Sequence, residues 1–121
     1  MAKADGAAFT ARNVTGRDFT GSDLRGARLV DLDLRGKDFS YARAGGAFFQ
    51  RSLLNGAQFR GADLRGGVFR DACLRGVVLS NADVAGADFT GADVTGASIT
   101  TAQIRQVIGW RTSRSASPCL S

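Results

Sequence analysis

The apolar residues of this chain recur with a period of five. Between residues 9 and 104, every fifth position is apolar, without an insertion. Along an α-helix, five residues turn through about 500°, so these side chains would spiral around the helix. Along a β-strand, an odd spacing would send successive members to opposite faces. The pattern therefore predicts a chain that turns once per five-residue repeat. The twenty central positions are Phe9, Val14, Phe19, Leu24, Leu29, Leu34, Phe39, Ala44, Phe49, Leu54, Phe59, Leu64, Phe69, Leu74, Leu79, Val84, Phe89, Val94, Ile99 and Ile104.

The residues around each centre indicate how the chain turns. Ala stands two positions before the centre in twelve repeats, Asp stands immediately before it in eight, and Gly stands two positions after it in twelve. Gly relieves the steric cost of a corner, and Asp is short enough to hydrogen-bond to the nearby backbone. A small Ala beside a large centre lets two inward side chains share a narrow interior. Turn formation therefore accounts for the Asp residues without a catalytic role.

Residues 62–66 read ADLRG, residues 87–91 ADFTG and residues 92–96 ADVTG. These segments resemble the pentapeptide-repeat family, whose motif is A(D/N)LXX. The resemblance extends over residues 7–106 and implies an all-β fold, a right-handed quadrilateral parallel β-helix with four repeats per coil and about five coils. We expect residues 1–6 to form an N-terminal tail, and residues 111–121, which are Ser-rich and basic, to be disordered.

Residues 101–110 are expected to cap the C-terminal end of the β-helix. Thr100 or Thr101 is placed to start a short helix over residues 102–108, which Gly109 would end. Family members commonly carry such a helix, and some dimerise through it. The side chains expected to cover the last coil, and to act as an end cap or a dimer contact, are Ile104, Val107, Ile108 and Trp110.

The residue before each centre should point outward, and residues twenty apart should stack on one face. Apolar residues at these outward positions predict an apolar patch on the middle coils. Its members are Phe48, Leu53, Val68, Cys73 and Val78. A contiguous exposed apolar group often marks a contact surface. We expect Phe48 to anchor a partner protein or a homodimer, whereas the alternative is that these side chains bury against one another.

Three cations occupy inward positions that are usually Ala. They are Arg12, Arg17 and Lys37. Because cations cannot be buried side by side without counter-charges, we expect these chains to extend outward past distorted corners, towards nearby Asp residues. The alternative is a small anion-binding opening near Tyr41 and Ala44. Ala44 is also the undersized centre, and we expect neighbouring side chains to close any void beside it.

The formal net charge is +5, and the positive and negative residues are unevenly distributed along the chain. Residues 77–104 carry only negative charge, so Asp83, Asp88 and Asp93 are candidates for an acidic face. Stacked carboxylates, such as those of Asp63 and Asp83, should raise one pKa of each pair. Four Arg residues that follow successive centres should encircle the rod, a poor shape for clamping a nucleic-acid duplex. We therefore expect no direct binding of nucleic acid.

The residue inventory offers little catalytic chemistry. The sequence has no His, and no nucleophile, metal cluster or phosphate loop accompanies the Asp residues, so we expect no enzyme, metal or cofactor. Cys73 lies in the repeats and Cys119 in the tail, and we expect both to be reduced thiols in a cytoplasmic protein. No apolar run approaches a membrane span, and residues 1–11 lack a hydrophobic signal core.

Three functional interpretations remain. The first is a bacterial-type, non-enzymatic rod that acts as a rigid protein–protein interaction module, with its partner unknown. The second follows from the resemblance: some family members resemble duplex DNA, act on DNA gyrase and protect cells from gyrase poisons, which implies a role in antibiotic resistance. That mimicry needs an acidic surface along the rod, and the net charge of +5 departs from it. The third is small-molecule binding or an accessory role in a biosynthetic pathway. We favour the first.

Overall fold

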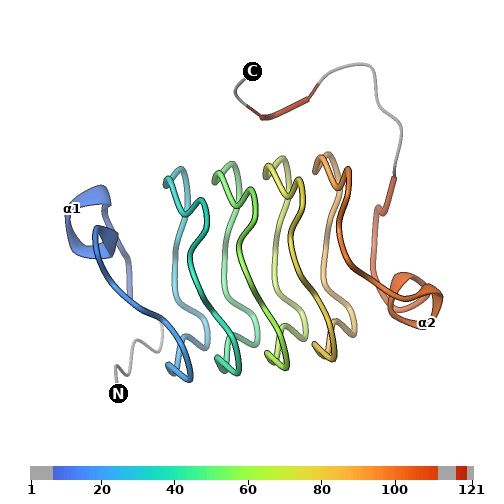
Figure 1. Ribbon diagram of the computed structural model, residues 1–121, viewed down its shortest axis with the longest axis horizontal. Coiled ribbons are helices and arrows are strands. Elements are labelled where there is room, and N and C mark those ends of the chain that lie inside the picture. Colours follow the sequence, from blue (N-terminus) through green and yellow to red (C-terminus); the bar gives the residue numbers. More distant parts are fainter. Residues whose placement is uncertain (1–6, 112–116, 120–121) are drawn as a thin grey trace.

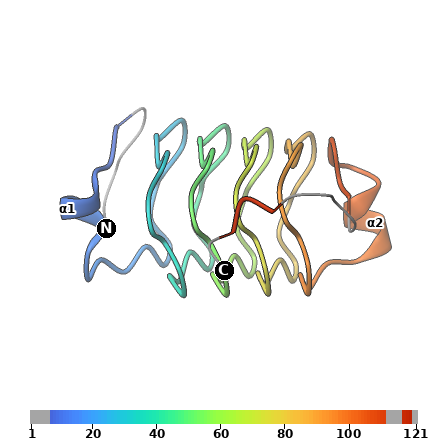
Figure 2. The same ribbon diagram turned by 90° about the horizontal axis from the view of Figure 1, so that it is seen from above.

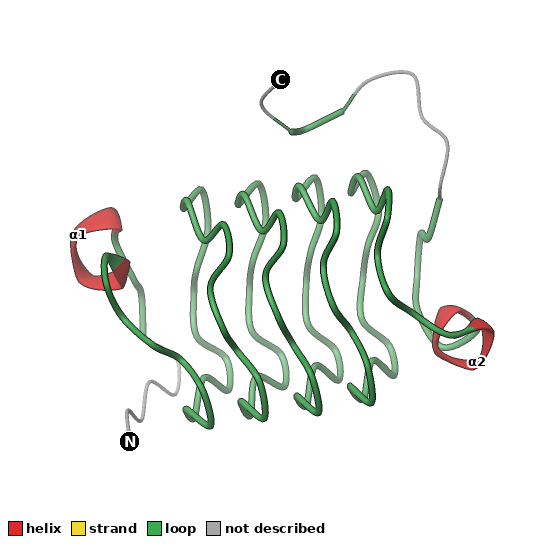
Figure 3. Cartoon of the chain, viewed as in Figure 1, coloured by secondary structure: helices red, strands yellow, loops and turns green. Residues whose placement is uncertain are grey.

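The computed structural model describes residues 7–111 and 117–119. The chain winds into a rod of stacked coils, with helix α1 (Ala11–Val14) at one end and helix α2 (Thr101–Ile104) at the other (Figure 1). Parallel β-bridges join residues twenty apart, as between Asp23 and Arg43, so each coil takes four repeats. The predicted four-sided parallel β-helix is therefore the observed fold. Each side contributes a single bridge, and the coils carry no extended strand (Figure 3).

The corners have the conformation that the Gly positions predict. All twelve repeat glycines two positions after a centre have a positive φ, between 65° and 76°. At a typical corner, the Ala27 N–H donates to the Leu24 carbonyl across the turn, with a donor–acceptor distance of 3.0 Å. Five corners place another residue in the same left-handed region, among them Tyr41 at φ 62° and Arg51 at φ 58°. Because only Gly adopts this region without strain, the Gly spacing sets the coil geometry.

The core is a continuous column of centres and inward Ala side chains. Phe39 lies between Phe19 and Phe59, and its ring stacks on theirs at centroid distances of 4.9 and 4.8 Å. A second stacked ladder runs through Phe49, Phe69 and Phe89. The two ladders meet edge to face, at 5.7 to 5.9 Å. The rings of the middle coils are therefore buried against the coils on both sides. Ala44, the undersized centre, is fully buried in this core.

Helix α1 replaces one side of the first coil, which the sequence pattern did not predict. Thr10 caps it and forms a capping box with Asn13. Arg12 lies in this helix and is exposed, which avoids burying a charge in the first coil. Arg17 is also exposed, and its guanidinium lies 5.4 Å from the centre of the Phe9 ring. Both side chains therefore lie outside the core, as expected.

Lys37 does not reach the Asp residues towards which we expected it to extend. Its Nζ donates to the backbone carbonyls of Val14 at 2.7 Å and Arg17 at 3.2 Å. The half-buried ammonium thus binds peptide oxygens of the preceding coil. Because the Lys37 ammonium already donates to two backbone carbonyls, it is engaged there and does not line the alternative anion-binding opening.

Helix α2 is shorter than the predicted helix over residues 102–108. It ends at Ile104, and Ile108 instead forms a parallel bridge with Asp88. Thr100 is the N-cap, as one of the two candidates predicted. Among the predicted cap side chains, Ile104 and Val107 are half-buried, Ile108 is 56% exposed, and Trp110 packs edge to face on Phe89 at 5.2 Å. Ile108 therefore extends an outer face and does not cover the last coil.

Gln103 is the buried side chain of α2. Its Nε2 donates to the Leu79 carbonyl at 2.7 Å and to the Ala82 carbonyl at 3.0 Å, while its Oε1 accepts the Thr100 N–H. This polar side chain thus supplies hydrogen-bond donors to two backbone carbonyls of the preceding coil. Neither helix among the described residues is long or apolar enough to cross a membrane.

Candidate interaction surface

The outward residues form four columns, one on each side of the rod. Face 1 has an unbroken ladder of parallel bridges along its whole length. Its members are Ala8, Arg28, Phe48, Val68, Asp88 and Ile108. Phe48 and Val68 stack at its middle, as predicted, and both are half-buried. The guanidinium of Arg28 lies 5.6 Å from the centre of the Phe48 ring. Face 1 therefore presents an apolar centre with a cation on one side.

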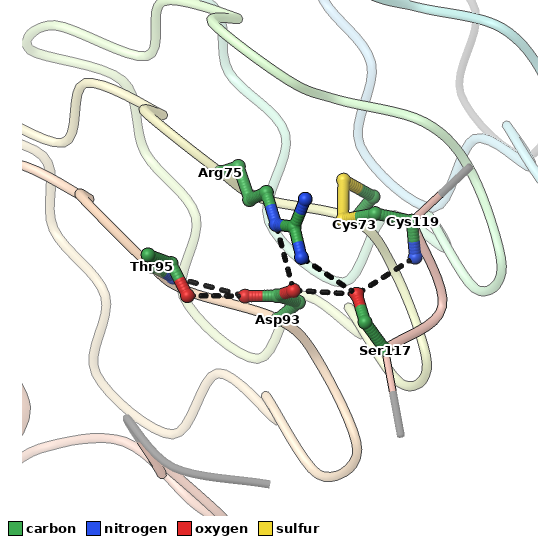
Figure 4. Close-up of a disulfide and its surroundings, with 6 residues drawn as sticks. All are labelled: Cys73, Arg75, Asp93, Thr95, Ser117 and Cys119. Atoms are coloured by element: carbon green, nitrogen blue, oxygen red, sulfur yellow. Dashed lines mark hydrogen bonds and ion pairs between the residues drawn. A yellow bond between two sulfur atoms is a disulfide. The ribbon is translucent and has the colours of Figure 1, made fainter. Parts of the chain in front are cut away.

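Face 2 is covered by the C-terminal segment of the same chain. Its ladder runs through Asp33, Leu53, Cys73 and Asp93. A disulfide joins Cys73 to Cys119, so the prediction of two reduced thiols is wrong (Figure 4). Cys73 is fully buried and is not part of an open contact surface.

The segment that covers face 2 lies in the tail that we expected to be disordered. Residues 117–119 are placed against the rod, and Figure 2 shows this part of the tail above the middle coils. Pro118 lies beside Leu53, with which it lines one shallow depression. Residues 1–6, 112–116 and 120–121, which the predicted tails also include, lie outside the described residues.

The predicted apolar patch is consequently divided. Val78 is half-buried on face 3, where it bridges to Gln58 and Ser98. In a four-sided coil, face 3 is opposite face 1, and the tail segment lies on the face between them. Phe48 and Val68 therefore form one apolar centre, and Val78 lies apart from it.

The acidic residues of the last coils do not form one face. Asp83 lies on face 4, whose ladder is Asp23, Arg43, Asp63 and Asp83, whereas Asp88 lies on face 1 and Asp93 on face 2. Each also has an Arg of the preceding coil nearby, with closest N···O distances of 3.7 Å to Arg65, 3.3 Å to Arg70 and 2.9 Å to Arg75, respectively. Opposite charges in contact cancel much of the field that a partner would meet. The predicted acidic face is therefore wrong, and these residues instead form an ion-pair ladder between coils.

Every Asp that precedes a centre accepts a backbone N–H from two residues further on, as the turn interpretation predicts. These bonds favour the ionised form. The Thr20 hydroxyl and N–H lower the pKa of Asp18, and the Arg65 guanidinium lowers the pKa of Asp63 against the opposing effect of burial. The pKa of neither Asp18 nor Asp63 is raised, because hydrogen-bond donors are the largest cause of each shift.

Asp93 is the most enclosed of these carboxylates. Its side chain is only 4% exposed, and burial by itself would raise its pKa. Hydrogen bonds from Ser117, Thr95 and Arg75 outweigh this and hold the pKa of the carboxyl well below its usual range. The site is thus an anchoring point for the tail on face 2.

Possible chemistry elsewhere on the rod is limited. A shallow depression beside α2 is lined by polar residues, among them Asn81, Asp83, Thr100 and Gln106. This set pairs no nucleophile with a base. Within residues 7–111 and 117–119, no group of three or more Cys or Asp side chains is placed to hold a metal ion.

Sequence reasoning missed Arg28, Ser117 and Pro118 as surface residues of interest. Arg28 stands where the motif has Asp, a departure that could have marked it. The second Cys, in the tail, was the signal for Ser117 and Pro118, because a disulfide between Cys119 and Cys73 places the neighbours of Cys119 against the rod.

The sequence matches pentapeptide repeats, in eight copies, over residues 5–36, 38–71 and 72–108. The chain belongs to the pentapeptide-repeat family. Among solved structures, a pentapeptide-repeat protein from the thylakoid lumen of Arabidopsis thaliana is 31% identical, with a TM-score of 0.53. The match covers 77% of this chain and 61% of that protein.

Two further solved structures share the repeat at lower identity. HetL from Nostoc sp. strain PCC 7120, a pentapeptide-repeat protein involved in the regulation of heterocyst differentiation, is 26% identical over 77% of this chain and 47% of its own, with a TM-score of 0.33. QnrB1, a plasmid-mediated fluoroquinolone resistance protein, is 19% identical over 86% of this chain and 61% of its own, with a TM-score of 0.43. This pentapeptide-repeat chain thus spans about half to three fifths of these proteins. No curated protein matches the sequence significantly.

Proposed function

We infer that this pentapeptide-repeat rod is a non-enzymatic protein–protein interaction module that binds through face 1. The observation that carries this proposal is the apolar centre of Phe48 and Val68, half-exposed on an unbroken ladder. The backbone of that face is fixed by bridges from Ala8 to Ile108. A rigid face loses little conformational freedom on binding, so even a small apolar centre can contribute to affinity.

The order of residues along face 1 favours a second copy of this chain as the partner. The face reads Arg28, Phe48, Val68, Asp88 at equal spacing. If two copies meet face to face with opposite directions, a two-fold axis passes between Phe48 and Val68. Each Phe48 then lies opposite the Val68 of the other copy, and each Arg28 lies opposite an Asp88. The face is therefore complementary to itself, as a two-fold interface requires.

The first test is self-association of Phe48→Asp, measured by sedimentation equilibrium. One face of a short rod is a small interface, so we expect wild-type dissociation constants of about micromolar. Phe48→Asp should raise the dissociation constant about tenfold or more, because it places a charge in the apolar centre. Gln58→Asp is the matched control, since Gln58 occupies the equivalent outward position two sides further along the chain. Equal effects of both variants, or a strictly monomeric wild type, would rule out this interface.

A charge exchange tests the antiparallel arrangement. Arg28→Glu alone should weaken self-association by like-charge contact with Asp88, and Asp88→Lys alone should do the same through Arg28. Mixed together, the two variants should form a heterodimer at least as tight as the wild-type homodimer, because both cross-contacts then join opposite charges. A mixture that stays as weak as either variant alone would exclude this geometry. Circular dichroism of each variant checks that the coils are intact.

The other interpretations have less support. The gyrase interpretation depends on an acidic face, and the three candidate carboxylates lie on different sides beside Arg residues. The small-molecule interpretation depended on cations at inward positions, and Lys37 binds backbone carbonyls instead. A cytoplasmic location stays a prediction. It is compatible with a disulfide only if that disulfide can be reduced and re-formed there.

A further inference from the structure

The C-terminal segment is held on face 2 by one covalent and several polar contacts (Figure 4). Cys119 is bonded to Cys73. The Ser117 hydroxyl donates to the Asp93 carboxylate and accepts the Cys119 N–H at 3.1 Å. Arg75, which pairs with the same carboxylate at 2.9 Å, lies 3.5 Å from the Ser117 oxygen. We use the term strap for residues 117–119.

The strap changes what face 2 exposes. The Asp93 side chain is 4% exposed, whereas the side chains of Asp88 and Asp83, at the equivalent outward positions one and two sides earlier, are 20% and 53% exposed. Cys73 is fully buried, although the outward residues Val68 and Val78 before and after it are half-exposed. The outward positions next to face 2 are therefore partly open to solvent, whereas Cys73 and Asp93 have a segment lying over them. On face 2, the strap is what lies there.

The polar contacts alone are a weak means of holding three residues. Hydrogen bonds and ion pairs near a surface contribute little net free energy, because water competes for each group. Ordering the backbone and side chains of the strap costs conformational entropy, which these contacts must offset. The covalent bond reduces that cost, because it keeps Ser117 close to Asp93. The disulfide therefore decides whether the strap stays on face 2.

We propose that the strap is a redox-controlled cover of face 2, which leaves the rod when the Cys73–Cys119 disulfide is reduced. This proposal rests on the proposed interaction function, because the release of the strap changes the surface that is available to a partner. Release uncovers Leu53 and Cys73 beside the Phe48 and Val68 centre of face 1. The apolar patch predicted from the sequence is then continuous across two adjacent faces. The reduced protein accordingly presents a larger apolar surface than the oxidised protein.

The chemistry is thiol–disulfide exchange. On reduction, the thiolate of a low-molecular-weight thiol or of a dithiol oxidoreductase attacks one sulfur of the disulfide, and the other sulfur leaves as a thiolate. A second thiol resolves the mixed disulfide. In total, two donor thiols become one disulfide while Cys73 and Cys119 each gain a proton and become thiols. The reverse reaction consumes one small-molecule or protein disulfide and returns two thiols.

The test follows the strap by ¹⁵N NMR relaxation of the full chain in oxidised and reduced glutathione buffers. In the oxidised protein, we expect backbone order parameters near 0.85 at Ser117 and Cys119, and after reduction values below about 0.6. Signals of Leu53, Cys73 and Asp93 should shift, while those of the buried Phe ladder stay in place. Alkylation with a maleimide, read by mass spectrometry, counts the free thiols in each buffer.

Two variants provide controls. Cys119→Ser cannot form the disulfide and should show a mobile strap in both buffers, without loss of the coils. Ser117→Ala keeps the disulfide and should retain an ordered Cys119 in the oxidised buffer. The proposal is overturned if the strap stays ordered after reduction, or if an excess of reduced glutathione leaves the disulfide intact. Self-association is measured on the same samples, so a reduced protein with a released strap that remains monomeric counts against the proposed function alone.

Discussion

Leu32 occupies an inward position that is Ala in most repeats, and Ser52 on the next coil makes this substitution compatible with the turn. In the other turns, an N–H donates directly to the carbonyl three residues earlier. At this corner, the Leu32 N–H donates to the Ser52 oxygen at 3.0 Å, and the Ser52 hydroxyl donates to the Leu29 carbonyl at 2.6 Å. The hydroxyl thus bridges the N–H and the carbonyl of this turn.

Replacing Ser52 should therefore cost more than a typical Ser→Ala change. Ser52→Ala leaves a buried N–H and a buried carbonyl without a partner, which should lower the free energy of unfolding by about 1–3 kcal/mol. Urea denaturation measures this value. In a Leu32→Ala background, the turn can close directly, so the same change should cost about 0.5 kcal/mol or less. Equal costs in both backgrounds would show that the hydroxyl does not bridge the turn.

At the scale of elements, helices α1 and α2 and the last edge of the rod, residues 107–110, depart from the five-residue pattern. Each helix has a Thr N-cap and a capping box, with Asn13 in α1 and Gln103 in α2. After α2, residues 107–110 return to the rod. Ile108 joins face 1, and Trp110 packs on the end of a Phe ladder. Between them, Gly109 has a φ of 74°.

Gly109→Ala should detach residues 107–110 from the end of the rod. A Cβ there would lie 2.7 Å from the Thr90 Cα and 2.8 Å from the Thr90 nitrogen, both backbone atoms that cannot swing away. We expect the fluorescence of Trp110, the one tryptophan of the chain, to shift to longer wavelength, and its quenching by acrylamide to rise. Gly96→Ala is the matched control, with a φ of 73° and no atom nearer than 3.7 Å. It should cost about 1 kcal/mol of stability through backbone strain but leave the emission of Trp110 unchanged.

For the whole molecule, ion pairs connect turns and coils along the rod. Asp23 is the clearest case, because its side chain is 6% exposed and the Arg25 guanidinium donates to both of its oxygens, at 2.9 and 2.7 Å. The hydrogen bond from Arg25 lowers the pKa of Asp23 to about 2, although burial opposes the shift. A carboxyl whose pKa is lower in the folded state contributes stability at pH values above its unfolded pKa.

The free energy of unfolding should therefore fall as the pH drops from about 4 to about 2. In this interval Asp23 binds a proton in the unfolded chain but stays ionised in the folded rod, so protonation favours the unfolded state. Urea midpoints between pH 6 and pH 2.5 measure this change. Asp23→Asn keeps the oxygen that accepts the turn N–H but cannot titrate, so its midpoint should vary less over this interval. Asp33→Asn is the control, since that carboxylate makes the same contacts with Arg35 at 55% exposure and should contribute a smaller share. A pH profile that is identical in the wild type and Asp23→Asn would contradict the assignment.

Much of the fold could be predicted because the repeat specifies local geometry again and again. Gly two positions after a centre and Asp before it fix each corner, and their spacing stacks residues twenty apart. The pairing of Phe48 with Val68 and the turn role of Asp63 follow from that register. The outward placement of Arg17, at a position the register makes inward, follows instead from the cost of burying its charge. Helix α1 was not predicted, because the five-residue apolar period continues through Val14 without a break. The capping box of Thr10 and Asn13 nevertheless makes the backbone helical there.

The sequence by itself determined the period and the inward and outward sets, because each depends on residues that are close in the chain or repeat at a fixed interval. The four-sided coil was expected from the resemblance to the pentapeptide-repeat family. Only the tertiary structure decided which outward residues remain open. Cys73 and Cys119 are 46 residues apart, and no repeat relates them. Their bond places the strap over Leu53 and Asp93 and leaves Phe48 and Val68 free. Likewise, Asp83, Asp88 and Asp93 are one charge run in sequence but three separate ion pairs in space, because the chain turns a corner between each of them.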